Sequence, residues 1–251
     1  MIIKLEKRNK CKFRQSEHLH HFTDNNLFSL ANYKYCDKPK YDCNQHKKLI
    51  VLSPPQWMEG EIHLAEKLIH EGIDGFHVRK PGWDRAQMAH YIGSFPATLR
   101  QKIILHDHYA LADKYGLLGI HISQKHRGKG FEKIHPHRQV SVSTHSLKEL
   151  EQLEHRYAYA FLSPIFDSIS KQGYRSGFDL HELKTFFRRH TSPVPVVALG
   201  GISRKNLPLL KHIGFTGIAL LGALWMQEDH HLHESLIMEE YFKIKEHLSA
   251  L

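Results

Sequence analysis

The chain has 251 residues and a formal net charge of +9, which is unevenly distributed. Residues 1–48 hold eleven Lys and Arg against five Asp and Glu, whereas residues 49–251 hold 24 against 21. The nearly balanced body has no Lys and Arg stripe, so we do not expect nucleic-acid binding as its main role. The longest apolar run, Ile218–Met226, is far shorter than the ~20 residues of a membrane span, so no membrane partner is expected.

Residues 1–47 are predicted to be a basic N-terminal extension, separate from a domain at residues 48–251. The extension mixes basic, polar and aromatic residues without sustained periodicity, and the sequence leaves open whether it is ordered. It contains all three cysteines, Cys11, Cys36 and Cys43. A body without disulfides is typical of a reducing compartment, so the cytoplasm is the expected location. Because Cys36, Cys43 and His46 lack zinc-finger spacing, no metal site is predicted there.

From Lys48 onward, short apolar segments alternate with helical patterns. The predicted strands are Leu49–Leu52, Gly75–Arg79, Ile103–His106, Gly119–Ile122, Gln139–Ser143, Tyr159–Leu162, Val194–Leu199 and Gly217–Leu221. The predicted helices are Glu59–Glu71, Arg85–Phe95, Tyr109–Tyr115, Leu147–Leu153, Leu180–His190, Lys205–Ile213 and Leu236–Leu248. Ser146 with Glu149, and Asp179 with Glu182, have the spacing of reciprocal caps that begin a helix. No helix is predicted between Ser123 and His137.

Eight such units predict an α/β protein, a single (β/α)8 TIM barrel, because near-continuous apolar strands belong to a parallel sheet covered by helices. Eight is also the number of strands that closes a barrel. An open doubly wound sheet is the alternative. It would favour a Gly-x-Gly-x-x-Gly turn after the first strand, where the chain instead has Ser53-Pro-Pro-Gln56.

Two glycine-ended strands late in the chain indicate a phosphate-binding site. Val194-Pro-Val-Val-Ala-Leu-Gly-Gly-Ile-Ser203 and Gly217-Ile-Ala-Leu-Leu-Gly-Ala223 correspond to the seventh and eighth strands. Backbone N–H groups at the ends of these strands hold phosphate in many barrels. The chain is therefore predicted to bind a phosphorylated small molecule through Gly200, Gly201, Leu221 and Gly222.

Residues that leave the C-terminal ends of the strands are the candidates for chemistry, because barrel active sites are built there. They are His77 and Arg79, His106 and Asp107, His121 and Gln124, Ser143 and His145, Ser163 to Lys171, Gly200 and Gly201, and Leu221 and Gly222. The side chain of His121 is expected to point into the barrel core, so we do not count it as catalytic. His77 is interpreted either as a site residue or as an interior polar group.

The order of these segments resembles the thiamine-phosphate synthase and TenI family over about residues 48–228. The segments that carry the resemblance are Gly75-Phe-His-Val-Arg-Lys80, Gly119-Ile-His-Ile-Ser-Gln124, Val142-Ser-Thr-His-Ser146, Ser163-Pro-Ile-Phe-Asp-Ser-Ile-Ser-Lys171, Ala198-Leu-Gly-Gly-Ile202 and Gly217-Ile-Ala-Leu-Leu-Gly222. The resemblance implies a single barrel that acts on the phosphorylated thiazole half of thiamine.

Departures from the family pattern bear on which of its two activities to expect. The synthase joins thiazole phosphate to hydroxymethylpyrimidine diphosphate with release of diphosphate, and it uses Mg²⁺. Where the resemblance implies an Asn-Asp pair and a second Asp, this chain has His106-Asp107 and His126. Mg²⁺ takes oxygen ligands, so His126 is a poor replacement for a carboxylate. Lys80 and Lys125 are the candidates to replace a missing family lysine.

The sequence is therefore interpreted first as a TenI-type thiazole tautomerase, with His145 and His77 as catalytic residues. Imidazole can move a proton near neutral pH without a metal, so no cofactor is expected. The predicted substrate-binding residues are Arg79, Asp107, Ser143, Ser168, Ser170, Lys171, Gly200, Gly201, Leu221 and Gly222. Alternatives for single residues are an Arg79–Asp107 ion pair of purely structural role and a solvated Lys171.

Two other functions stay open at this point. The first alternative is a thiamine-phosphate synthase with Mg²⁺ as cofactor, and the second is a non-catalytic sensor of thiazole phosphate or thiamine phosphate. The expected partner in each case is a small phosphorylated molecule. The sequence does not determine the oligomeric state, and it is compatible with a homo-oligomer.

Overall fold

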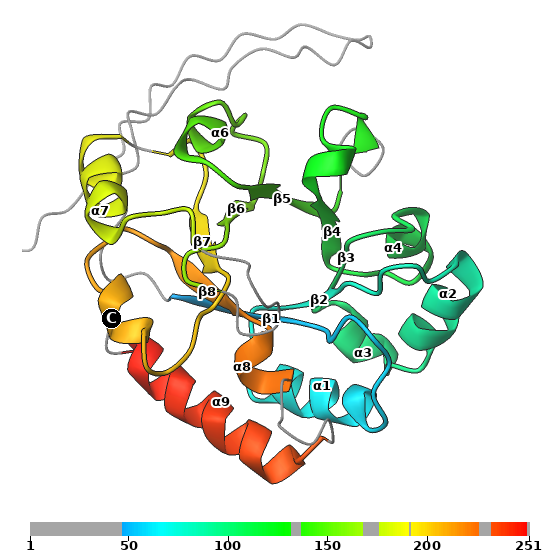
Figure 1. Cartoon of the computed structure of the whole chain (residues 1–251). Coiled ribbons are helices and arrows are strands. Elements are labelled where there is room, and N and C mark those ends of the chain that lie inside the picture. Colours follow the sequence, from blue (N-terminus) through cyan, green and yellow to red (C-terminus); the bar gives the residue numbers. More distant parts are fainter. Residues whose placement is uncertain (1–46, 132–136, 168–175, 191, 226–231, 250–251) are drawn as a thin grey trace, which may run out of the picture. The chain divides into compact units, whose positions relative to one another are not determined.

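The computed structural model describes residues 47–131, 137–167, 176–190, 192–225 and 232–249, and these residues contain a closed barrel of eight parallel strands (Figure 1). The strands are β1 (Lys48–Leu52), β2 (Gly75–Val78), β3 (Ile103–Leu105), β4 (Gly119–Ile122), β5 (Gln139–Thr144), β6 (Tyr159–Leu162), β7 (Val196–Leu199) and β8 (Gly217–Leu220). Each strand pairs in parallel with the next, and β8 pairs with β1. The predicted TIM barrel is confirmed, and the open sheet is excluded.

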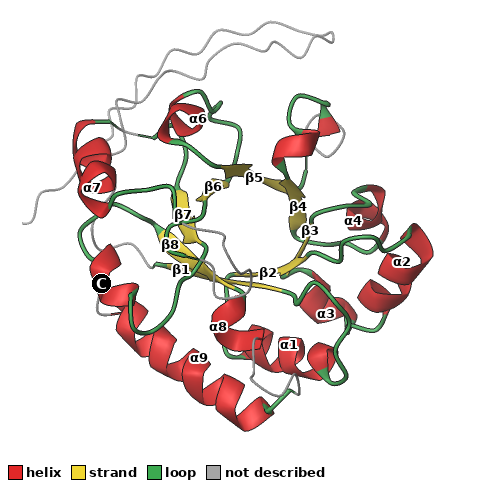
Figure 2. Ribbon diagram, in the orientation of Figure 1, coloured by secondary structure: helices red, strands yellow, loops and turns green. Residues whose placement is uncertain are grey.

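Helices surround the ring of strands, as Figure 2 shows. They are α1 (Glu61–His70), α2 (Arg85–Gly93), α3 (Ala97–Arg100), α4 (Ala110–Lys114), α6 (Leu147–Glu151), α7 (Leu180–Arg189), α8 (Gly222–Trp225) and α9 (Glu234–Ser249), with 3₁₀ helices η1 (Gln124–His126) and η2 (Leu207–Leu210). No helix in the described ranges is both long and apolar enough to cross a membrane.

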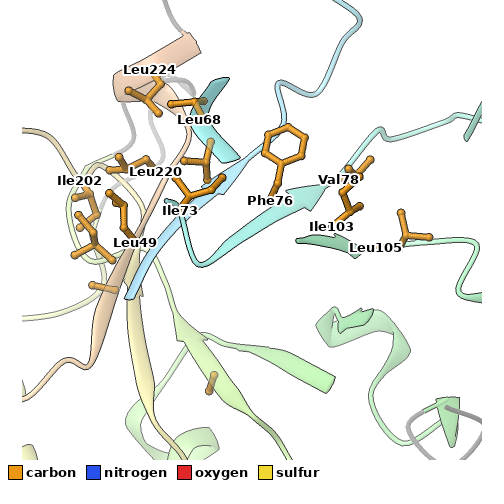
Figure 3. Packing of buried hydrophobic residues seen from close by; sticks show 14 of the residues in the cluster. Leu49, Leu68, Ile73, Phe76, Val78, Ile103, Leu105, Ile202, Leu220 and Leu224 are labelled. Atoms are coloured by element: carbon orange, nitrogen blue, oxygen red, sulfur yellow. The ribbon is translucent and has the colours of Figure 1, made fainter. Parts of the chain in front are cut away.

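Alternating side chains divide the apolar residues of the strands into two groups. One side of each strand faces the helices, where Phe76 and Leu220 pack with Leu68 of α1 and Leu224 of α8 (Figure 3). The other side faces the barrel interior, which contains Ile50 and other apolar side chains of a separate cluster. Full burial of one such side chain stabilises the fold by about 1.5–3 kcal/mol. Because successive side chains of a strand point to opposite faces, each strand buries apolar side chains both under the helices and inside the barrel, and this burial stabilises the closed ring.

The helices agree less closely with the sequence analysis than the strands do. The predicted helix Lys205–Ile213 is wrong in type, because only the short 3₁₀ helix η2 forms there, with Pro208 in its first turn. Short α3 and α8 were not predicted. Ser146 and Asp179 do cap their helices through the backbone N–H groups three residues later. The reciprocal cap occurs instead between Asp84 and Gln87 at the start of α2.

An ion pair without solvent exposure joins the end of β2 to α1. The Lys80 ammonium lies 2.5 Å from a carboxylate oxygen of Glu61, and it donates to the carbonyl oxygen of Gln56 at 2.9 Å. Burial lowers the pKa of Lys80, and Glu61 acts in the opposite direction. The rings of Trp83 and Tyr91 lie 5.2 Å from the same ammonium. Lys80 is therefore held in the structural frame of the barrel.

We predict that Glu61→Gln destabilises the protein strongly, by about 3–5 kcal/mol, because it leaves a buried ammonium without its counterion. The free energy of unfolding from denaturant titrations measures the effect. The double variant Glu61→Gln with Lys80→Met should recover most of the loss. If the single variant unfolded at the denaturant concentration of the wild type, the pair would not stabilise the fold.

Candidate functional site

A cavity of about 490 Å³ opens at the C-terminal ends of the strands. Its lining comes from the strand exits and the loops after them: Leu52, Arg79, Pro81, Gly82, His106, Asp107, Ser123, Gln124, Lys125, Ser143, His145, Phe161, Ser163, Pro164, Leu199, Gly200, Gly201, Ile202, Ala219, Leu221 and Gly222. The volume lies in the range of small-molecule sites. Because parallel strands end at one side of the barrel, residues far apart in the sequence meet here.

Most of the site residues predicted from the sequence line this cavity. They are Arg79, Asp107, Ser143, His145, Gly200, Gly201, Leu221 and Gly222. His77 does not, because its side chain is fully buried in the barrel interior beneath the cavity. Ser168, Ser170 and Lys171 lie outside the described residues. Lys80 is buried against Glu61, so it does not serve as a replacement cation in the cavity.

The turn after β7 forms one wall of the cavity. Gly200 and Gly201 have φ values of +97° and +64°, and a Cβ on Gly201 would lie 2.2 Å from the carbonyl oxygen of Asp167. These glycines are therefore required by close packing and by their backbone conformation. The Asn206 amide donates to the Gly201 carbonyl oxygen at 2.7 Å and holds the turn in place.

Backbone donors at this wall are available for an anion. Within the described residues, the N–H groups of Gly201 and Ile202 have no hydrogen-bond acceptor. Gly222 is the first residue of α8, so its N–H has no partner within the helix. The side chain of Trp225 donates to the Leu52 carbonyl oxygen at 2.6 Å, which ties α8 to the end of β1. This wall matches the phosphate site that the glycine-ended strands predicted.

Charged side chains lie across the cavity, at the exits of β2, β3 and β4. Arg79 is exposed, and its backbone N–H donates to the Ser53 hydroxyl at 2.9 Å. The Asp107 carboxylate lies 3.5 Å from the Lys125 ammonium and 3.9 Å from a ring nitrogen of His126. In the described ranges no ion pair joins Asp107 to Arg79, so the alternative of such a pair is not supported. Arg79 and Lys125 thus supply two positive charges at this side for a second anionic group.

Asp107 is the only carboxylate among the described residues that line the cavity. Proteins bind Mg²⁺ through one or two carboxylates together with phosphate oxygens, so this side chain fits a Mg²⁺ ion shared with a substrate phosphate. His126 stands where a second carboxylate was expected. The Tyr109 hydroxyl donates to the His121 carbonyl oxygen, so it accepts a hydrogen bond from Nδ1 of His126 at 2.9 Å. The cavity therefore fits Mg²⁺ with Asp107 alone as protein carboxylate.

His145 lines the cavity, and a hydrogen bond determines its tautomer. Its Nδ1 lies 2.9 Å from the carbonyl oxygen of Ser163, and since a carbonyl oxygen can only accept, Nδ1 carries the hydrogen. In the neutral ring Nε2 is then the acceptor. Arg127 binds Glu149 at 2.9 Å and the carbonyl oxygen of Ser143, and so fixes the chain just before His145. The geometry suits a general base.

Three histidines lie beneath the cavity inside the barrel: His77, His106 and His121. Burial lowers the pKa of each, to about 3 for His121, and the Arg79 charge lowers the pKa of His106 and His121 further. All three rings are therefore neutral at pH 7. Of the three, only His106 lines the cavity.

The sequence analysis did not count His106 or Asn206 among the substrate-binding residues, and it named Lys125 only as a candidate to replace a missing family lysine. His106 and Gln124 did appear among the residues at strand ends, so position alone could have identified His106. Lys125 lies in the short 3₁₀ helix η1, and Asn206 lies in the turn just before η2. Their contribution depends on where the loops fold back, which the local pattern does not specify.

Comparisons with known proteins agree with this geometry. A family model described as thiamine monophosphate synthase matches residues 49–224. Thiamine-phosphate synthase of Listeria welshimeri is 28% identical over 185 residues, which cover 67% of this chain and 86% of that protein. The relative of the same name from Lysinibacillus sphaericus is 28% identical over 174 residues, covering 66% and 81%.

Solved structures show the same likeness. The crystal structure of thiamine phosphate pyrophosphorylase from Bacteroides thetaiotaomicron has a TM-score of 0.66 and 29% identity, covering 81% of this chain and 98% of that one. The corresponding protein of Pyrococcus furiosus has a TM-score of 0.63 at 21% identity, covering 80% and 96%, and supports the fold alone.

We predict that the stability of the protein falls as the pH is lowered from about 7 toward 4. The unfolded chain binds protons at histidine near pH 6.5, whereas the buried rings do not, so folding loses up to about 1.4 kcal/mol per pH unit for each ring. His121→Gln removes one titrating group and keeps a polar side chain. Denaturant titrations at several pH values should give it a shallower pH slope than the wild type, and equal slopes would contradict the prediction.

Proposed function

The chain belongs to the thiamine monophosphate synthase family, and on this premise we propose that it joins a phosphorylated thiazole to hydroxymethylpyrimidine diphosphate, with release of diphosphate. The single observation that carries the proposal is the pair of anion-binding sides in one cavity. Backbone donors at Gly201 and Gly222 form one side, and the cations Arg79 and Lys125 form the other. A reaction between two phosphorylated substrates requires both.

The names of the relatives favour this function over the tautomerase that the sequence analysis placed first. The Listeria, Lysinibacillus and Bacteroides proteins are named for thiamine phosphate synthesis, and their matches cover most of each relative. The chain is thus expected to be an enzyme that acts as a transferase. In the sequence, the missing second carboxylate argued against a synthase. The cavity nevertheless contains the carboxylate of Asp107, with the cations Arg79 and Lys125 in the same lining.

The proposed reaction assigns one task to each side of the cavity. The thiazole phosphate binds the backbone donors near Gly201 and Gly222, which directs the ring toward the centre of the barrel mouth. The diphosphate of the pyrimidine binds Arg79 and Lys125. The thiazole nitrogen forms a bond to the pyrimidine methylene carbon while the carbon–oxygen bond to diphosphate breaks, and diphosphate leaves with that electron pair. The two cations stabilise the charge that develops on it.

Mg²⁺ bound by Asp107 and by diphosphate oxygens would neutralise further charge on the leaving group. Lys125 lies 3.5 Å from the same carboxylate, so its ammonium competes with an ion for Asp107 and also supplies a charge of the same sign. For this chain we therefore expect a weaker dependence on Mg²⁺ than a site with two carboxylates would have.

A second candidate function is the proton-shift isomerisation of a phosphorylated thiazole, the TenI-type tautomerase. The observation that favours it is the ring of His145, which lines the cavity and whose Nδ1 donates to the Ser163 carbonyl oxygen, so that Nε2 of the neutral ring is the base. The same cavity could hold this substrate on the donors of Gly201 and Gly222. A non-catalytic sensor would bind the thiazole phosphate and turn over neither substrate set.

The deciding experiment gives purified protein both substrate sets in parallel. We expect thiamine phosphate to form from thiazole phosphate and the pyrimidine diphosphate, at a rate that rises with Mg²⁺. If the protein isomerised the thiazole tautomer but formed no thiamine phosphate, the second candidate function would replace the proposal. Calorimetric binding of thiazole phosphate without either turnover would indicate the sensor.

Asp107→Asn is predicted to slow thiamine phosphate formation by about 10²-fold, because it removes the carboxylate that fits Mg²⁺ and orients Lys125. The Mg²⁺ concentration for half-maximal rate should rise as well. Asp113→Asn is the matched control. Asp113 lies on the outer helix α4, where it forms an ion pair with Arg138, and it does not line the cavity. A normal rate in Asp107→Asn would show that the diphosphate does not bind at this side.

His145→Ala separates the two candidate functions. It is predicted to slow a proton shift on the thiazole by about 10²–10⁴-fold, the usual contribution of a positioned acid–base group, while thiazole phosphate still binds. Thiamine phosphate formation, which transfers no proton through this ring in the proposed reaction, should change much less. An equal loss in both reactions would mean that His145 shapes the cavity rather than moving a proton.

A further inference from the structure

The barrel interior contains a set of polar side chains below the cavity, which neither candidate function uses. Hydrogen bonds join them in two branches, Ser143–His121–Ser141 and Tyr159–His77–His106, which meet at the paired strands β5 and β6. Both end members, Ser143 and His106, line the cavity. We call this set the interior relay.

Four links of the interior relay are direct hydrogen bonds. His121 lies 2.7 Å from the Ser143 hydroxyl through Nε2 and 2.8 Å from Ser141 through Nδ1. On the other branch, His77 lies 2.6 Å from the Tyr159 hydroxyl through Nε2 and 2.9 Å from His106 Nε2 through Nδ1. Every ring nitrogen of His77 and His121 thereby has a partner. Among the residues that the structure describes, Nδ1 of His106 has none and can bind a ligand.

The link between the two branches is made by Ser141 and Tyr159. These residues are register partners on β5 and β6, and both side chains are buried. Burial raises the pKa of Tyr159, and the neighbouring Ser141 acts in the opposite direction. The pairing of the two strands brings these residues side by side, and proton transfer between the branches has to cross from one hydroxyl to the other.

We propose that the interior relay carries protons between two points of the cavity, from His106 at one end to Ser143 at the other. Each neutral member donates one hydrogen bond and accepts one, so all hydrogen bonds of the chain can point either toward Ser143 or toward His106. In one direction all three imidazoles carry hydrogen on Nδ1, and in the other all three carry it on Nε2.

The transfer leaves the number of protons on every group unchanged. When His106 Nδ1 takes a proton from a bound molecule, its Nε2 proton passes to His77 Nδ1 and the Nε2 proton of His77 passes to Tyr159. The Tyr159 proton passes to Ser141, and that of Ser141 to His121 Nδ1. Finally His121 gives its Nε2 proton to Ser143, whose hydroxyl proton enters the cavity. Solvent in the vacated cavity returns the chain to its first direction.

Burial supports transfer through neutral rings. The pKa of His77, His106 and His121 is lowered, so a charged imidazolium is disfavoured inside the barrel. A molecule that loses a proton at one atom and gains one at another is the substrate class that such a chain serves. The kinetic test below therefore rests on the second candidate function, whereas the relay itself does not.

A metal site is the competing explanation for three clustered histidines. Their ligand atoms lie within 4.8 Å of one another. A metal ion, however, lies in the plane of each imidazole that binds it, and the rings of His106 and His121 are stacked at 4.2 Å with planes only 24° apart. The ion would also displace the hydrogen bonds of His77 and His121. The geometry thus favours the relay.

Nitrogen NMR of isotope-labelled protein tests the relay without any substrate. The wild type should show neutral His77, His106 and His121 in one common tautomer. Tyr159→Phe removes the central hydroxyl that joins the two branches. In this variant the tautomers of His77 and His121 should no longer agree, because each ring then follows only its own branch. Tyr157→Phe, the same change at a buried tyrosine outside the relay, should leave them unaltered. Ser141→Ala breaks the same link from β5 and replaces Tyr159→Phe if that variant does not fold.

Kinetics provide the second readout. On a phosphorylated thiazole tautomer, Tyr159→Phe should lower kcat by about 10²-fold and leave KM unchanged. Thiamine phosphate formation should keep its rate in the same variant. If the wild type shows no proton-shift turnover, the NMR result alone decides, since that outcome concerns the second candidate function and not the relay.

Several results would overturn the proposal. Mixed tautomers or a charged ring in the wild type would show that the hydrogen bonds do not form one chain. A parallel loss of both reactions in Tyr159→Phe would indicate a purely structural role. Stoichiometric Zn²⁺ binding that His77→Gln abolishes would establish a metal site in its place.

Discussion

Closure of the barrel encloses an interior in which every side chain must either pack against apolar neighbours or find a hydrogen-bond partner. Buried polar groups without partners cost free energy comparable to that of a lost hydrogen bond or more. In this chain β1, β7 and β8 direct apolar side chains inward, and so does β3 with Ile104, whereas β2, β4, β5 and β6 direct histidine, serine, tyrosine and phenylalanine, and His106 follows β3. The polar half is tolerated because its members bond to one another, and it ends directly beneath the cavity.

The same constraint shapes the cavity above. Close packing forces glycine at Gly200 and Gly201, and this packing leaves backbone N–H groups available for an anion. On the opposite side, Lys80 is held against Glu61 and is not available, so Arg79 and Lys125 provide the positive charge. Structural requirements and ligand binding are thus met by different residues, although these residues are neighbours in the sequence.

Family membership and site geometry lead to related but distinct conclusions. The comparisons name thiamine phosphate synthesis, and the two anion-binding sides of the cavity agree with it. The histidines agree instead with proton transfer. Only one carboxylate is available for Mg²⁺, and in its vicinity Lys125 supplies a fixed positive charge. In this cavity the Lys125 ammonium supplies part of the positive charge that Mg²⁺ would supply at a site with two carboxylates. The imidazoles add groups that can take and give protons.

The sequence by itself determined the strands, their order and the barrel, because short apolar segments that alternate with helical patterns, and strands that end in glycine, are local signals. It also identified Arg79, Asp107, Ser143 and His145 as residues at strand ends, which all parallel strands place at one side of a barrel. Only the tertiary structure decided that His77 faces inward beneath the cavity and that Lys80 pairs with Glu61. Likewise, the links from His106 to Tyr159 cross the barrel between strands that are distant in the sequence. A single strand's pattern cannot specify such contacts, because the partner of an inward side chain depends on the register and curvature of the whole closed sheet.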